Sequence, residues 1–159
     1  MSAVGGAAWR EALDRLGVLV GEWVVEADFT DPDRVDPDVP AGRSVFAWDL
    51  DGRFLVQRTR IPVAGAPDSM AVIAVDPGSG AYTYHYFDSR GVVRTYAMSF
   101  DGEEWTLLRE TADFSPLSFR QRFVGRVGDG AIRGVWEQAK AESAPWERDF
   151  GLVYRRSGR

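Results

Sequence analysis

The chain of 159 residues contains no cysteine and only one histidine, His85. The lack of cysteine excludes a disulfide scaffold, a cysteine-ligated zinc site, an iron–sulfur cluster and thiol catalysis. A single histidine cannot build a multi-histidine site, so no metal is expected. No apolar run approaches the roughly 18 residues of a membrane span. Residues 1–8 also lack the basic stretch and hydrophobic run of a secretory signal. The sequence therefore predicts a cytoplasmic protein without a membrane span.

Basic residues are outnumbered, 19 to 24, by acidic ones, which gives a formal net charge of −5. Nucleic acids and anionic membranes bind basic surfaces, so neither is an expected partner. Nucleotide-binding glycine loops, G-x-S-x-G and H-E-x-x-H are absent as well, which disfavours nucleotide hydrolysis and metalloprotease chemistry. Aromatic residues, by contrast, are abundant: six tryptophans, five tyrosines and nine phenylalanines. The length predicts one domain over residues 1–159.

One helix is expected, over about residues 7–20. There Trp9, Leu13, Leu16 and Val20 recur at steps of three and four residues, with charged residues between them. Beyond it, alternating apolar and polar residues separated by turn dipeptides are typical of strands. The expected strands lie at about 22–29, 43–50, 53–61, 69–76, 81–88, 92–100, 103–111, 117–127, 131–140 and 148–156. No helix separates them, so the sequence predicts an all-β fold, an antiparallel up-and-down β-barrel over about residues 21–156.

Asp-Gly dipeptides at 51–52, 101–102 and 129–130 predict tight hairpins, because a type I′ turn needs positive φ at both central positions. Hairpin register decides which residues face the barrel interior. The predicted pairs on the inner face are Trp48 with Leu55, Phe46 with Gln57, Met98 with Trp105, Tyr96 with Leu107, Arg94 with Arg109, Phe123 with Trp136, and Gln121 with Gln138.

The turn after Asp88 allows two registers. A two-residue turn at Ser89-Arg90 places His85 beside Arg94 on the inner wall. A three-residue loop, 89–91, instead turns His85 outward and brings a stripe of three tyrosines inward. The stripe consists of Tyr82, Tyr84 and Tyr86. If it faces outward, it predicts either cover by the N-terminal helix or a homodimer surface.

The predicted row of His85, Arg94 and Arg109 is the main candidate site. Two guanidiniums and an imidazole inside a barrel are costly unless an anion neutralises them, which indicates a ligand carboxylate or phosphate. The alternative is that both arginines reach water at a rim or pair with Glu110 or Asp88. His85 suits acid–base chemistry by its ordinary pKa, or it is simply a packed residue.

Inward-facing amides are the second feature. Gln57, Gln121 and Gln138, together with Thr59, either bond to one another and to trapped water or orient a ligand in an apolar cavity. The expected cavity wall includes Trp48, Trp105, Trp136, Phe123 and Met98. These features predict binding of a small, largely apolar or aromatic acid inside the barrel. The alternative is a cofactor-free isomerase, cyclase or decarboxylase with His85 or Tyr96 as acid and base.

A short motif connects the chain to a known superfamily. Gly21-Glu22-Trp23, directly after a short helix, resembles the opening motif of the lipocalin-type calycins. The segments at 48–55, 86–91 and 99–102 are similar to an uncharacterised bacterial family of lipocalin-like domains, over about residues 13–156. The resemblance implies that Trp23 closes the base of the barrel and that Arg155 or Arg156 packs across it.

Nitrobindin-type haem barrels and fatty-acid-binding-protein-like barrels are distant relatives of that family. Nitrobindins continue their opening motif with glycines, where this chain has Val24-Val25, and they bind iron through a histidine near the C-terminus. This chain has no such histidine, so the resemblance implies no haem, with His85 as the only conceivable axial ligand. The acidic, proline-rich segment 31–40 is expected to be a solvated loop or a lid at the barrel mouth.

Overall fold

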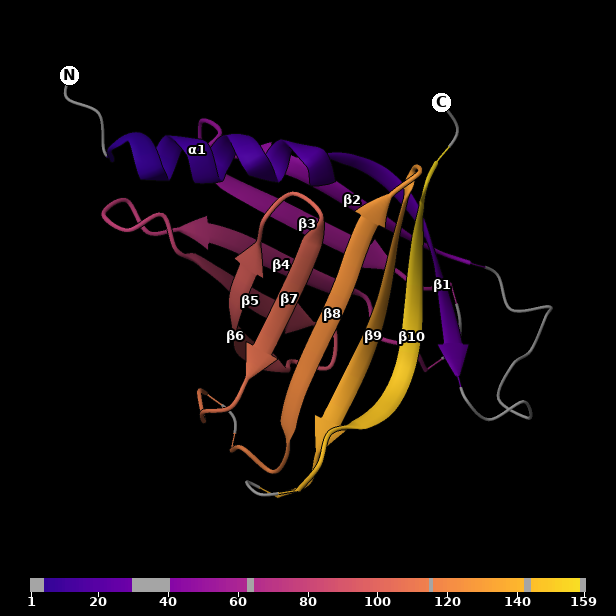
Figure 1. The fold of residues 1–159 in the computed structure, drawn as a ribbon. Coiled ribbons are helices and arrows are strands. Elements are labelled where there is room, and N and C mark those ends of the chain that lie inside the picture. Colours follow the sequence, from indigo (N-terminus) through magenta and orange to yellow (C-terminus); the bar gives the residue numbers. More distant parts are fainter. Residues whose placement is uncertain (1–4, 30–40, 63–64, 115, 142–143, 158–159) are drawn as a thin grey trace.

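The computed structural model describes residues 5–29, 41–62, 65–114, 116–141 and 144–157. Within these ranges the chain forms one α-helix, α1 (Ala7–Leu16), a 3-10 helix, η1 (Gly17–Leu19), and ten strands. The strands are β1 (Gly21–Phe29), β2 (Gly42–Asp49), β3 (Phe54–Arg60), β4 (Ser69–Val75), β5 (Tyr82–Asp88), β6 (Val93–Phe100), β7 (Glu104–Arg109), β8 (Arg120–Gly128), β9 (Ala131–Ala139) and β10 (Glu147–Arg156). Consecutive strands pair antiparallel, and β1 pairs with β10, which closes the barrel (Figure 1).

The predicted fold class is confirmed: this is a closed, antiparallel, up-and-down barrel with a short N-terminal helix. The helix is shorter than expected, because after Leu16 the chain tightens into the 3-10 turn η1. The predicted lid segment 31–40 lies outside the described residues.

Two of the three Asp-Gly turns form as predicted. Asp51 and Gly52 have φ of 59° and 75°, and Asp129 and Gly130 have φ of 52° and 71°. These are the positive angles that a type I′ turn requires. The pairs that depend on them, including Trp48 with Leu55 and Phe123 with Trp136, are therefore correct.

The third Asp-Gly turn lies one residue further along the chain than predicted, which shifts the cross-strand pairing by two residues. Phe100 pairs with Trp105, and Asp101 pairs with Glu104, so the central residues are Gly102 and Glu103. Only Gly102 has a positive φ, 98°, as at the first position of a type II′ turn. The Asp101 carboxylate accepts the N–H of Glu103 at 2.8 Å and thereby holds this turn.

This shift keeps the inner face but changes the partners on it. The predicted pairs of Met98 with Trp105, Tyr96 with Leu107, and Arg94 with Arg109 are wrong. Met98 pairs with Leu107 instead.

The β5–β6 turn is the three-residue loop. Tyr86 pairs with Arg94 and His85 with Thr95, so the predicted pair of His85 and Arg94 is wrong. The physical reason is again a side-chain cap: Asp88 Oδ1 accepts the N–H of Arg90 at 2.9 Å, and Gly91 takes a φ of 84°. The tyrosine stripe therefore faces the interior. Tyr82 and Tyr84 are buried, so the outward-facing stripe that the predicted homodimer surface required is not formed.

Helix α1 lies across one end of the barrel (Figure 1). Its apolar face, with Trp9, Leu13 and Leu16, is buried. The Tyr82 hydroxyl, inside the barrel, donates to the Ala12 carbonyl at 2.6 Å and ties the helix to β5. Burying each of these side chains contributes about 1.5–3 kcal/mol to the stability of the fold, which holds the helix against the end of the barrel.

Trp23 closes the same end of the barrel from inside. Its side chain is buried, and its indole N–H donates to the Leu19 carbonyl at 2.9 Å. The Arg156 guanidinium lies 4.1 Å from the ring centre and donates to the Val18 carbonyl at 2.6 Å. Arg156, rather than Arg155, thus packs across the tryptophan. The arrangement is consistent with a lipocalin- or calycin-like fold.

Aromatic rings fill the middle of the barrel with edge-to-face and tilted contacts, of which aromatic pairs favour the edge-to-face kind. The rings are those of Phe46, Tyr84, Tyr96, Trp105, Phe123, Trp136 and Tyr154. Phe123 lies over the paired glycines Gly125 and Gly134, where any side chain would collide with its ring. These glycines thus make room for an aromatic ring as well as interrupting their strands.

Candidate functional site

The barrel interior changes character along its axis. Inward-facing residues near α1, such as Trp23, Leu55 and Phe100, are buried. At the opposite end, Tyr86, Arg94, Gln121, Trp136 and Gln138 share the inner face yet are only partly buried. Solvent therefore reaches the interior from the end away from α1. We call these five residues the polar mouth.

Arg94 is the cation of the polar mouth. Its Nη1 donates to Gln121 Oε1 at 3.0 Å, and its guanidinium lies 5.7 Å from the ring centre of Phe119. Its Nε is buried without a hydrogen-bond partner in the described part of the chain. In that same part, no carboxylate forms an ion pair with Arg94. The positive charge of this side chain is thus held by an amide and a ring, and it is not neutralised there.

Arg109, the second predicted cation, is neutralised. Its Nε and Nη2 each donate to the Asp113 carboxylate at 3.0 Å, and the two side chains are 2% and 11% exposed. This contact raises the pKa of Arg109 further above its ordinary value, since Asp113 stabilises the charged form. Asp113 Oδ2 also accepts the N–H of Thr95 at 2.9 Å. The predicted row of His85, Arg94 and Arg109 is therefore replaced by one partly buried cation, Arg94, and one ion pair.

Gln121 links these groups. Its Oε1 accepts hydrogen bonds from Arg94 and from the Tyr96 hydroxyl, each at 3.0 Å. Across the sheet it pairs with Arg109 on one side and with Gln138 on the other. Burial raises the pKa of Tyr96 despite the neighbouring Arg94, so its hydroxyl stays protonated and serves as a donor.

Gln57 belongs to the packed interior instead. Its Oε1 accepts from the Tyr84 hydroxyl at 2.7 Å, and its Nε2 donates to Ser44 Oγ at 3.0 Å. Ser44 in turn contacts the hydroxyl of Thr59 at 3.0 Å. Burial holds the pKa of Tyr84 well above its ordinary value. The described partners of Gln57 are thus hydroxyl groups of the packed interior rather than the other two glutamines.

No protein-family model and no curated protein matches the chain.

The predicted cavity wall is divided among three places. Met98, Trp105 and Phe123 are buried in the aromatic core, whereas Trp136 lies in the polar mouth. Trp48 is 38% exposed and lies at the α1 end, so it does not line this site. Trp105 Nε1 is buried, and no partner for it is found among the residues described.

His85 lies on the outer face of β5, where its Nε2 is 2.9 Å from Thr83 Oγ1. An acid–base role for it inside the barrel is therefore ruled out by this geometry. The interior also has no histidine to act as an axial haem ligand, since His85 is the only one in the chain. No group of three or more histidine, aspartate or glutamate residues that could hold a metal gathers in the described ranges. In those ranges, no helix is long and apolar enough to cross a membrane.

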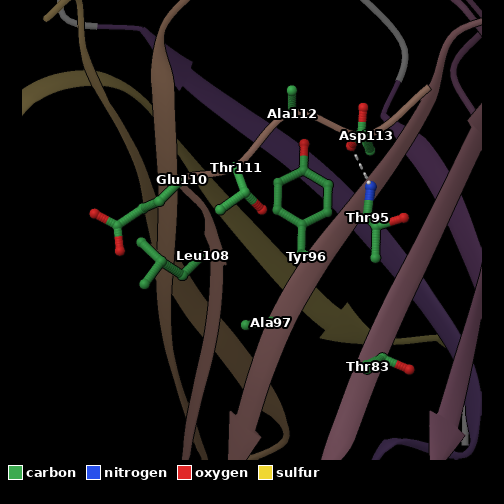
Figure 2. Close-up of a pocket in the computed structure, with 9 residues that line it drawn as sticks. All are labelled: Thr83, Thr95, Tyr96, Ala97, Leu108, Glu110, Thr111, Ala112 and Asp113. Atoms are coloured by element: carbon green, nitrogen blue, oxygen red, sulfur yellow. Dashed lines mark hydrogen bonds between the residues drawn. The ribbon is translucent and has the colours of Figure 1, made fainter. Parts of the chain in front are cut away.

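A pocket of about 550 Å³ lies in the barrel wall, where β6 and β7 separate (Figure 2). Pairing between these strands ends at Ala97 and Leu108, and beyond them Thr95 is held by Asp113 instead. The pocket lining consists of Thr83, Thr95, Tyr96, Ala97, Leu108, Glu110, Thr111, Ala112 and Asp113. Tyr96 and Asp113 thus border the wall pocket and also contact the groups of the interior.

Two residues of the site were not predicted from the sequence. Asp113 follows β7 by four residues, and Phe119 precedes β8 by one. Asp113 lies outside the alternating strand pattern from which inner-face residues are recognised, whereas Phe119 lies in the expected strand 117–127, at the same alternation as Gln121 and Phe123, and could have been recognised from that pattern. No spacing rule identifies the ion pair, because residues four apart lie side by side in a helix, whereas Arg109 ends a strand.

Proposed function

We propose that the protein binds a small, largely aromatic or apolar ligand with an anionic group in the polar mouth of the barrel. The observation that carries this proposal is Arg94, an inward-facing guanidinium without a carboxylate partner among the described residues. A partly buried charge is stabilised by an opposite charge, and guanidinium binds a carboxylate or sulfonate through paired hydrogen bonds.

The walls around Arg94 support an aromatic ligand. Trp136 and Tyr86 face inward and remain partly exposed, so their rings offer flat apolar surfaces to a bound molecule. Gln121 and Gln138 add amide groups that can orient its polar end. This combination of an apolar wall with a few convergent polar groups is typical of small-molecule sites.

We also propose that the chain is a calycin. The closed barrel, the opening Gly21-Glu22-Trp23 and the stacking of Arg156 on Trp23 support this assignment. Catalysis is not part of the proposal, because His85 lies outside the interior and the raised pKa of Tyr96 suits a hydrogen-bond donor rather than a base.

Calorimetric titration with 2-naphthalenesulfonate, an aromatic monoanion, tests the binding proposal. Arg94→Met should weaken binding by about 10- to 100-fold, since a hydrogen bond to a charged group contributes about 1.5–3 kcal/mol. Arg133→Met, which removes an exposed arginine from the outer face of β9, is the matched control and should bind like the wild type. The absence of wild-type binding, or equal affinity in the wild type and Arg94→Met, contradicts the proposal.

A further inference from the structure

We infer that Asp113 limits the ligand of the polar mouth to a single negative charge. This inference rests on the proposed function and narrows its ligand class. Two inward-facing guanidiniums on the neighbouring strands β6 and β7, those of Arg94 in the mouth and Arg109 next to it, both lie beside Gln121: Arg94 donates to its side chain, and Arg109 is its cross-strand partner. Two such cations together would suit a doubly charged group such as a phosphate monoester. Asp113 neutralises Arg109, so Arg109 is not available to bind a ligand anion.

The geometry of the ion pair supports this assignment. Both contacts between Arg109 and Asp113 are 3.0 Å, in the paired arrangement that guanidinium and carboxylate favour. With side chains 2% and 11% exposed, the pair is weakly screened by water. A ligand that displaced Asp113 from Arg109 would deprive a nearly buried carboxylate of its guanidinium partner, which is strongly unfavourable.

Asp113 is also held in place from the other side. Its Oδ2 accepts the N–H of Thr95, where the ladder between β6 and β7 has ended. Figure 2 shows this bond at the edge of the wall pocket, with Tyr96 beside it. Because β6 positions the carboxylate independently of any ligand, its negative charge stays beside the mouth when a ligand binds. It then cancels the attraction that Arg109 would exert on a second negative charge, so Arg94 is left as the cation that binds the ligand, and such disfavouring of an alternative ligand is an effective source of specificity.

Two naphthalene probes of similar shape test the inference by calorimetry at pH 8. The sulfonate carries one negative charge, whereas 2-naphthyl phosphate carries two above its second pKa of about 6. The measured quantity is the ratio of the phosphate affinity to the sulfonate affinity. At the effective dielectric of a partly buried site, one unit charge within about 10 Å changes the affinity for a unit ion roughly tenfold.

The wild type, two single variants and one double variant differ in the net charge of the Arg109–Asp113 pair. We expect Asp113→Asn to raise the ratio about tenfold and Arg109→Gln to lower it about tenfold. The double variant Arg109→Gln/Asp113→Asn removes both charges and should return the ratio to the wild-type value. Asp129→Asn, the same change in the distant β8–β9 turn, is the control and should leave the ratio unaltered.

In the wild type, the ratio of the phosphate affinity to the sulfonate affinity should be lower at pH 8, where naphthyl phosphate carries two charges, than at pH 5, where it carries one. The sulfonate keeps one charge at both pH values and therefore corrects for other effects of pH. An unchanged ratio in Asp113→Asn overturns the inference and leaves the proposed function standing. If the single variants do not fold, the wild-type comparison decides, and tighter phosphate binding at pH 8 overturns the inference. If neither probe binds the wild type at either pH, the proposed function fails and the inference fails with it.

Discussion

Gly134→Ala should destabilise the barrel, although alanine ordinarily suits a strand better than glycine. The reason is the ring of Phe123, which lies over Gly134 and its cross-strand partner Gly125. A Cβ on Gly125 would meet Phe123 Cε2 at 2.8 Å, and a Cβ on Gly134 would be closer still. The ring cannot move aside freely, because its centre lies 5.1 Å from that of Trp105 and 5.2 Å from that of Trp136.

Two opposing contributions set the magnitude. Replacing glycine by alanine in a strand contributes about 0.5–1 kcal/mol of stability where space allows. Overpacking a filled core costs about 1–3 kcal/mol. We therefore expect a net loss of about 1–2 kcal/mol in the free energy of unfolding. For a chain of this length, that corresponds to a fall in Tm of roughly 2–8 °C.

Urea denaturation and thermal unfolding followed by circular dichroism measure this loss. Gly128→Ala is the matched control: it lies in the same strand pair, and a Cβ there meets nothing within 4 Å. It should be neutral or stabilising. Adding Phe123→Leu to Gly134→Ala should cost less than Phe123→Leu costs alone, because the smaller side chain relieves the collision. An unchanged or higher stability of Gly134→Ala would refute the packing explanation.

Two further predictions concern hydrogen bonds of the interior and its rim. Tyr84→Phe removes the donor to buried Gln57, so the free energy of unfolding in urea should fall by about 1–2 kcal/mol; an unchanged value contradicts the role of this bond. The pKa of Asp88 is lowered to about 2, with the hydrogen bonds from Arg90 and from the backbone outweighing the opposing effect of burial. Its contribution, about 1–2 kcal/mol, is therefore present above about pH 4 and lost as the pH falls towards 2. Asp88→Asn should lack that part of the pH dependence in urea titrations, and equal losses in both proteins would contradict it.

The barrel itself was predictable because its signals are local. Strand alternation and turn dipeptides place all ten strands close to their observed ranges. The turns at Asp51 and Asp129 also predicted register correctly, since their backbones follow from the positive φ that Asp-Gly allows. Cross-strand pairs such as Gln121 with Gln138 then follow from counting.

Register failed where an aspartate side chain, rather than the dipeptide, determines the turn. Asp101 accepts the N–H groups of Glu103 and Glu104 and moves the turn one residue onward. Asp88 accepts the N–H of Arg90 and supports a loop of three residues. Asp88 precedes Ser89 and Asp101 precedes Gly102. Because serine and glycine are accepted in several kinds of turn, each dipeptide is compatible with more than one turn geometry. A change in the number of loop residues from two to three was sufficient to exchange His85 for the tyrosine stripe on the inner face.

The net charge inside the barrel depends partly on residues that lie beyond the strand ends and that the alternating pattern of the strands does not identify. Arg94 and Arg109 both occupy inner-face positions, and from the strands alone they count as two cations. The partner of Arg109 lies four residues further on, beyond the end of β7, where it replaces the missing backbone bond to Thr95. The same break in the β6–β7 ladder therefore opens the wall pocket and positions the carboxylate that neutralises Arg109. A ligand site at a barrel mouth acquires its net charge from such strand ends, which is why Arg94 is the residue on which the binding proposal depends.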